Sequence, residues 1–225
     1  MAHHPPRPHI ALNFAISADG KISTRKGIPS GWTSTADFER FLQLRLSADA
    51  LLVGRGTLEA DRMSLTIPPR LGPARQPLRC VVSGSGRLNP EHKLFSTLGG
   101  PVHLLVSNPG CDFDPTFWQS KGVHLHAGTL AEFLQTLRRD CGVERILCEG
   151  GGTLVRALAE LDAIDEIHLT WAGHTLFGGH DAPSLSGQPG DHLRHSLGYE
   201  LVNFEPTPES GECFLTYRRS APAHS

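Results

Sequence analysis

A run of three glycines between an apolar segment and a helical pattern, within residues 144–158, limits the possible folds more than any other part of this sequence. The order predicts a strand, a tight turn and a helix. Glycines there let the backbone approach a ligand, and the first amides of the helix suit an anion such as phosphate. Glu149 lies just before the glycines at the carboxyl end of the strand, where open α/β sheets bind ligands. The stretch therefore predicts a nucleotide-phosphate site in an α/β fold, with an ordinary flexible turn as the alternative.

The composition predicts a folded protein that binds neither nucleic acid nor membranes. The 225 residues are 39% hydrophobic and 20% charged, with a formal net charge of −2. This balance argues against disorder and provides no basic surface for nucleic acid or lipid headgroups. No apolar run approaches the roughly 20 residues of a membrane helix. The proline-rich start has no apolar signal-peptide core, so we expect a cytoplasmic protein.

The cysteines and histidines do not predict a metal site. The five cysteines include no C-x-x-C pair, which argues against a structural zinc site and a disulfide framework. Among the 13 histidines, His103, His124, His126 and His168 alternate with apolar residues in strand-like runs, and no H-E-x-x-H pair occurs. We therefore expect no bound metal.

Apolar runs alternate with helical patterns along most of the chain, which predicts a mostly parallel sheet with helices on both faces. Strands are expected at residues 9–16, 49–54, 78–82, 101–107, 122–126, 144–149, 165–172, 199–204 and 212–218. Helices are expected at residues 34–47, 55–61, 129–140 and 154–161. The last two strands have no helix between them and predict an antiparallel hairpin at a sheet edge. The fold class is therefore α/β, a single three-layer domain over residues 8–219 with tails at 1–7 and 220–225.

Residues around the first long helix have more than one possible role. Trp32 lies among turn residues, where it would cover a ligand or close the edge of the core. Residues 34–37 resemble a capping box, in which a hydroxyl precedes a carboxylate. An apolar stripe that starts at Phe38 is expected in the core. Arg45, near the end of that stripe, would either extend to solvent or direct its guanidinium at an anionic ligand.

A second strand–glycine–helix junction occurs at residues 49–61, where Thr57 is expected to cap the helix and to touch a ligand. The strand at 78–82 ends in a turn that holds Ser83, Ser85 and Arg87 and no acid. Such a turn would accept the 2′-phosphate of NADPH, and an ordinary polar turn is the alternative.

Asn13 and six short motifs, taken in order, resemble one known family. The motifs are Ser-Ala-Asp-Gly-Lys-Ile at 17–22, Ser-Gly-Trp-Thr-Ser at 30–34, Asp-Ala-Leu-Leu-Val-Gly at 49–54, Gly-Thr-Leu-Glu-Ala-Asp at 56–61, Glu-Gly-Gly-Gly-Thr-Leu at 149–154 and Leu-Phe-Gly-Gly at 176–179. They make nearly the whole chain similar to the reductase domain of the riboflavin-pathway deaminase/reductase, the RibD C-terminal family. The resemblance implies a dihydrofolate-reductase-like fold. It also implies NADPH-dependent reduction of the ribosyl group of an aminopyrimidine ribosylamine 5′-phosphate to ribityl.

By position, the resemblance implies two sets of binding residues. The cofactor set is Ala15, Trp32, Gly54, Thr57, Asp61, Ser83, Ser85, Gly150, Gly151, Gly152, Thr153 and Leu154. The substrate set is Ser30, Arg45, Leu65, Arg70 and Glu149. Arg45 would bind the substrate phosphate, and Arg70 would replace a family arginine at the position of Pro68. Because the reduced nitrogen needs a proton, Asp61 or Glu149 is the expected catalytic group, with water as the alternative.

The chain departs from the family near the expected phosphates. The family's Asp-Asp-Pro is Asp61-Arg62-Met63 here, and its Asp-Ser pair is Ser83-Gly84. These changes leave two alternatives: a reductase of the same fold that acts on a pterin, or a non-catalytic nucleotide-binding protein. A pterin reductase would need an acid on the first long helix. Asp37 and Glu39 lie there, but Asp37 is expected to cap the helix and Glu39 falls off the apolar stripe.

The remaining expectations concern partners. The zinc-deaminase elements H-x-E and P-C-x-x-C are absent from the sequence, which predicts a reductase without a deaminase domain. Relatives of the family are often dimers, so the resemblance implies a homodimer. Phe204 and Phe214 on the last two strands are its expected surface.

Overall fold

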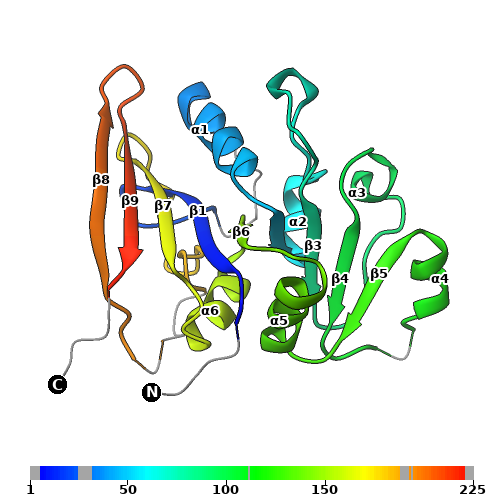
Figure 1. The fold of residues 1–225 in the computed structure, drawn as a ribbon. Coiled ribbons are helices and arrows are strands. Elements are labelled where there is room, and N and C mark those ends of the chain that lie inside the picture. The colour runs from blue at the N-terminus through cyan, green and yellow to red at the C-terminus, as the bar shows by residue number, and fades with distance from the viewer. Residues whose placement is uncertain (1–5, 25–31, 111, 188–192, 194, 221–225) are drawn as a thin grey trace. The chain divides into compact units, whose positions relative to one another are not determined.

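The computed structural model describes residues 6–24, 32–110, 112–187, 193 and 195–220 (Figure 1). Contacts divide the chain into two compact units. Unit 1 contains Met1–His9 and Leu44–Leu147, and unit 2 contains Ile10–Gln43 and Cys148–Ser225. Within the described ranges, no helix is both long and apolar enough to cross a membrane.

Unit 1 is built on a sheet with parallel strands. These strands are β2 (Ala50–Gly54), β3 (Leu78–Ser83), β4 (Val102–Val106), β5 (Val123–Ala127) and β6 (Arg145–Cys148), in the order β5-β4-β3-β2-β6. The pairs from β2 to β5 are all parallel. Every residue of β4 is buried, as are the first four of β2, because both faces of such a sheet are covered.

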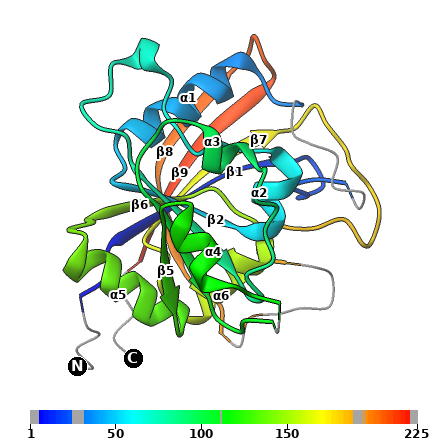
Figure 2. The same ribbon diagram turned by 90° about the vertical axis from the view of Figure 1, so that its right-hand side faces the viewer.

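The helices that the structure describes within unit 1 are α2 (Arg55–Asp61), the 3-10 helix η1 (Pro69–Leu71), α3 (Lys93–Ser96), α4 (Pro115–Ser120) and α5 (Leu130–Asp140). The sequence patterns predict α2 and α5 but not η1, α3 or α4. α5 agrees with the helix predicted at 129–140, and its N-cap Thr129 forms a capping box with Glu132 that was not predicted. α3 and α4 have four and six residues, too few to produce a helical period in the sequence. α4 lies against β5 (Figure 2).

Three histidines of β4 and β5 form a cluster in unit 1. His103 Nδ1 lies 3.0 Å from His126 Nε2, and the His103 ring stacks on His124 with 4.7 Å between centroids. Burial, with a smaller contribution from the other two imidazoles, lowers the pKa of His103 to about 4. Among the described residues, no group of three or more possible ligands is arranged to hold a metal ion. His103 is therefore a neutral side chain of the sheet at neutral pH.

Unit 2 combines a parallel strand pair with an antiparallel edge. Its strands are β1 (His9–Ser17), β7 (Glu166–Ala172), β8 (Tyr199–Thr207) and β9 (Glu212–Arg219), in the order β1-β7-β9-β8. β1 and β7 are parallel, whereas β9 is antiparallel to β7 and to β8. Figure 1 shows β8 and β9 as the long hairpin that the sequence predicts. The predicted α/β class, with mostly parallel strands and an antiparallel edge, is therefore confirmed.

Two helices continue the motifs singled out in the sequence. α6 (Gly152–Glu160) follows the glycine turn and buries Leu154, Val155 and Leu158. α1 (Thr35–Leu46) buries Leu42, but Phe38 is half exposed, so its assignment to the core was wrong. Helical spacing gives the face on which Phe38 lies. It does not give the length over which that face is covered.

Candidate active site

The candidate residues fall into two groups, one in each compact unit. The glycine turn, which follows β6 and leads into α6, lies in unit 2. Gly150 has a φ of 106°, a backbone conformation that favours glycine, and the Gly150–Gly151 peptide bond is cis. Gly151 is the N-cap of α6 and provides no side-chain cap. The first turn of α6 therefore presents backbone amides and no capping side chain, which is the arrangement that favours an anion.

The third glycine of the turn has a second reason to be glycine. A Cβ atom on Gly152 would lie 2.8 Å from the backbone N of Gly187 and 3.1 Å from the carbonyl O of Ser184. Contacts this short with backbone cannot be relieved by moving a side chain. Close packing of the chain against itself, which the sequence cannot reveal, thus accounts for Gly152 without any ligand.

Glu149 directly precedes the glycines, as predicted, and only 8% of the residue is exposed. The preceding thiol, Cys148, is fully buried, and this burial raises its pKa to about 12. The thiol is therefore inert, and the surroundings of the strand end are poorly solvated. A carboxylate in such a position needs hydrogen-bond donors to offset the loss of water.

Trp32 packs against the turn that follows β7. Its ring contacts Phe177 edge to face, with 4.8 Å between centroids. The carboxylate of Asp19 holds that turn by accepting from Phe177 N at 3.3 Å and from Gly178 N at 2.8 Å. Ala15 lies on β1, half-buried and in register with Thr170 of β7. Ser30, the remaining candidate of this region, lies outside the described residues.

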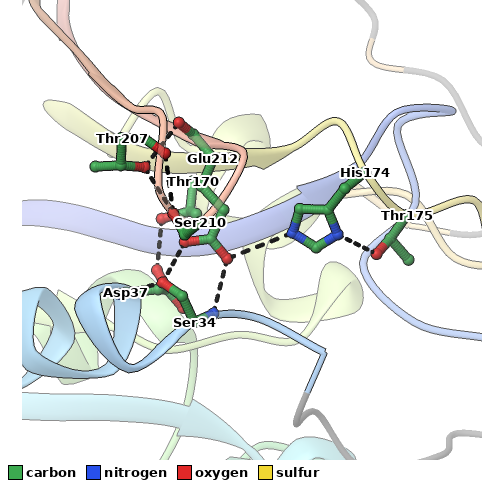
Figure 3. A network of polar contacts seen from close by, with 8 residues as sticks. All are labelled: Ser34, Asp37, Thr170, His174, Thr175, Thr207, Ser210 and Glu212. Carbon is green, nitrogen blue, oxygen red and sulfur yellow. Dashed lines mark hydrogen bonds and ion pairs between the residues drawn. The ribbon is translucent and has the colours of Figure 1, made fainter.

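The start of α1 differs from the predicted capping box (Figure 3). Ser34 is the cap, since its Oγ accepts from Asp37 N at 3.1 Å. The Asp37 carboxylate does not return to Ser34 N, because Glu212 accepts that hydrogen bond at 2.7 Å. Asp37 instead accepts from Thr170 Oγ1 at 2.5 Å. The expectation that Asp37 caps the helix was therefore wrong.

In unit 1, Arg45 is buried, with 7% of the residue exposed, so the alternative that it extends to solvent was wrong. Its Nη1 donates to the carbonyl O of Thr66 at 2.7 Å. The neighbouring Leu65 is fully buried with a φ of 54°, an uncommon backbone conformation for leucine. Gln76 fixes the same loop through two 2.8 Å hydrogen bonds to the backbone of Ile67. The guanidinium of Arg45 thus lies beside a tightly held loop.

The second glycine junction forms its helix over the predicted residues 55–61, but with a different N-cap. α2 starts at Arg55 with Gly54 as N-cap, so Thr57 lies inside the first turn and its assignment as a cap was wrong. Asp61 ends α2, and desolvation raises the pKa of its carboxyl group although part of the residue remains exposed. Arg70 lies exposed on η1.

The turn after β3 uses its serine hydroxyls internally. Ser83 Oγ accepts from Gly86 N at 3.0 Å, and Ser85 Oγ accepts from Arg87 N at 3.3 Å. Arg87 pairs with Asp112 at 3.2 Å. The premise that no acid lies near this turn was therefore wrong, because the acid comes from a later segment of the chain.

The family model described as the RibD C-terminal domain matches residues 8–208. The chain belongs to this family. It is 30% identical over 200 residues to the 2,5-diamino-6-ribosylamino-4(3H)-pyrimidinone 5′-phosphate reductase of Methanothermobacter thermautotrophicus, covering 87% of this chain and 91% of that protein.

Solved structures support the same fold. RibD of Acinetobacter baumannii superposes with a TM-score of 0.80 at 22% identity, covering 96% of this chain and 59% of that chain. A dihydrofolate reductase from Enterococcus faecalis, complexed with NADP(H), gives a TM-score of 0.53 at 18% identity, covering 95% and 97%. The predicted family, fold and enzyme class are confirmed: the chain is a reductase of the riboflavin-biosynthesis type.

Two parts of the polar network were not found from the sequence. Asp19 lies within a motif that carried the resemblance, yet its role in holding the turn at Phe177 was not predicted. Glu212 is a single acid at the start of an apolar strand. An acid at a position that the strand pattern assigns to the interior was the available signal for it.

Proposed function

We propose that this chain uses NADPH to reduce the ribosyl group of an aminopyrimidine ribosylamine 5′-phosphate to ribityl. The observation that carries the proposal is the buried Glu149 directly before an uncapped helix start. The Glu149 carboxylate can accept hydrogen bonds from an aminopyrimidine, and the backbone amides that follow it at the start of α6 can bind a phosphate. The name of the Methanothermobacter relative supports this substrate class.

The residues present fit a dinucleotide. The first-turn amides of α6, from Gly151 to Thr153, would bind the pyrophosphate, and Leu154, whose side chain is buried, would contribute backbone only. Ala15 and Trp32 would also hold the cofactor, as would Gly54, Thr57 and Asp61 of unit 1. Ser83 and Ser85 remain our candidates for the 2′-phosphate. When bound, NADPH would supply the hydride.

The substrate would be held mainly by charge. Arg45 would bind the 5′-phosphate, with Leu65 beside it and Arg70 as a second cation. Glu149 would accept hydrogen bonds from the amino groups of the pyrimidine. Ser30 stays a prediction.

A proton must reach the nitrogen when the ring-opened substrate, an imine, is reduced. Asp61 and Glu149 are the candidates, with water as the alternative. Desolvation raises the pKa of the Asp61 carboxyl group, which is the direction that suits a proton donor.

The proposal is tested by the rate of NADPH oxidation, followed by absorbance, with the pyrimidine ribosylamine phosphate as substrate. Formation of the ribityl product is expected, and NADH should be the poorer cofactor. No turnover with intact substrate, although NADPH binds, would contradict the proposed substrate.

A pterin substrate has one observation in its favour, which is that Asp37 on α1 is not a cap. Under this alternative the Asp37 carboxylate would face the pterin. Dihydrofolate would then compete with the pyrimidine for the enzyme. The names of the relatives favour the pyrimidine.

Replacing Arg45 with alanine should raise the KM for the phosphorylated substrate by about 100-fold, with a smaller effect on the KM for NADPH. The reason is that a charge-assisted contact to phosphate is lost from a buried position. Gln76→Ala provides the matched control, because it loosens the loop at Thr66 and Ile67 without removing a charge. Equal effects of both variants on KM would mean that Arg45 only supports the loop.

We also propose a homodimer formed through one face of the antiparallel sheet in unit 2. Strand register places nine apolar or aromatic residues on this face, namely Ile167, Leu169, Trp171, Leu201, Phe204, Pro206, Cys213, Leu215 and Tyr217. Phe204 is 61% exposed, whereas Phe214 points to the other face and is only 5% exposed, under the guanidinium of Arg40. Phe214 as a dimer residue was therefore wrong.

A second copy of the chain fits this face because none of the nine residues is charged, so these residues in two facing copies would not repel each other. Trp171, Leu201 and Phe204 expose on the order of 300 Å² per copy, and with their half-buried neighbours two copies would bury about 1,000 Å². Pairing along the open edge of β8 is disfavoured, since Pro206 lacks an N–H and the register shifts between Leu201 and Asn203.

The dimer is tested by molar mass in solution. Phe204→Asp should convert dimer to monomer at micromolar concentration, whereas Asn203→Asp, on the opposite face of β8, should not. A wild-type monomer would exclude the dimer. We also propose that the reductase domain spans residues 8–219, which the match of the family model to residues 8–208 supports. We further propose a cytoplasmic location.

A further inference from the structure

Glu212 is a buried carboxylate that the proposed chemistry does not use. Its side chain has no exposed surface, and both of its carboxylate oxygens accept hydrogen bonds from Ser34 (Figure 3). Oε1 accepts from Ser34 N at 2.7 Å, and Oε2 accepts from Ser34 Oγ at 2.5 Å. His174 Nε2 lies 3.8 Å from Oε1. A buried charge is costly unless it is fully hydrogen-bonded, so this carboxylate makes a specific connection between β9 and a residue 178 positions earlier.

The connection fixes the chain beside Trp32. Ser34 caps α1 and follows Trp32 by two residues, so its amide and hydroxyl set where the chain enters the helix. On its other side, the Trp32 ring rests on Phe177, whose turn is held by Asp19. Two carboxylates therefore restrain Trp32 indirectly. Asp19 acts through the turn at Phe177, and Glu212 acts through Ser34.

We infer that Glu212 is a positioning residue for cofactor binding, acting through Ser34 on Trp32. This inference rests on the proposed NADPH site, to which Trp32 belongs. If the backbone of Ser34 is released, the Trp32 ring has a wider range of positions, and NADPH has to restrict that range when it binds. The loss therefore falls on cofactor affinity and spares the later hydride transfer.

Glu212→Ala should raise the Kd for NADPH by about 10-fold and change kcat by less than about 3-fold. Glu212→Gln should stay within about 3-fold of the wild type, because the amide oxygen still accepts from Ser34 N and the amide nitrogen donates to Ser34 Oγ. Ser34→Ala combined with Glu212→Ala should be no worse than the more affected single variant, because both act on one contact.

Thr207→Val is the matched control. It removes the 2.7 Å hydrogen bond from Thr207 Oγ1 to the carbonyl O of Glu212 but leaves the carboxylate in place. This variant should lose stability and keep its NADPH affinity. If Glu212→Ala, measured where it is folded, binds NADPH like the wild type, or if Thr207→Val weakens binding equally, Glu212 is only structural and the inference is wrong.

A second readout needs no cofactor. With Trp118 and Trp171 replaced by Phe, Trp32 is the one remaining tryptophan of the three in the sequence. Glu212→Ala should then make its fluorescence more accessible to acrylamide, and Glu212→Gln should not. Unchanged quenching in Glu212→Ala would overturn the inference. A wild-type protein that fails to bind NADPH while this quenching difference holds would overturn the proposed cofactor instead.

Discussion

Glu149→Gln is expected to lower kcat/KM for the phosphorylated pyrimidine by about 100-fold or more. Glutamine has nearly the same shape, so the backbone of the glycine turn is kept while the charge is lost. The side chain is buried at the strand end, where a charged acceptor is worth more than it is in water. The substrate's amino groups would then face an amide that donates as well as accepts. Steady-state kinetics with saturating NADPH measure the effect.

Glu144, near the start of the same strand, provides the control for this variant. Its side chain is exposed and pairs with Arg138 at 2.9 Å. Glu144→Gln should leave kcat/KM unchanged. The KM for NADPH should stay near its wild-type value in Glu149→Gln, because the amides of α6 are not altered. A kcat/KM for Glu149→Gln within about 3-fold of the wild type would remove Glu149 from the active site.

Features that depend on neighbours in the sequence were predictable. The strand, glycine turn and helix at residues 145–160 follow from local pattern alone, as does the amphipathic helix α5. Ser34 was recognised as a cap because hydroxyls prefer that position. Each of these features needs only residues a few positions apart.

Features that join distant segments were not predictable. The spacing of Ser34 and Asp37 fits a capping box, but Glu212 displaces the Asp37 carboxylate from its place in that box. In the same way, Asp112 supplies an acid to a turn that has none of its own. A pattern in one segment cannot show that a stronger partner arrives from another, and polar side chains are therefore placed less securely than apolar ones.

The loss of Arg79 should strongly destabilise the fold. Arg79 lies on β3 with 7% of the residue exposed, and it donates to three backbone carbonyls. Nε donates to Gly100 O at 2.6 Å, and Nη1 donates to Leu94 O at 2.6 Å and to Thr97 O at 3.0 Å. Arg79→Met would fill a similar volume but leave these carbonyls without their donor. The free energy of unfolding should fall by about 3 kcal/mol, measured by chemical denaturation.

Arg75→Met shows what part of that loss is due to burial. Arg75 is a few residues away and pairs with Asp49 at 2.5 Å, but its side chain is 71% exposed. Exposed ion pairs contribute about 0 to 1 kcal/mol, so this variant should change the free energy of unfolding by less than about 1 kcal/mol. Equal losses in the two variants would mean that the carbonyls around Arg79 find other donors. The segment 94–100 would then be held by its apolar contacts, which include the fully buried Leu94.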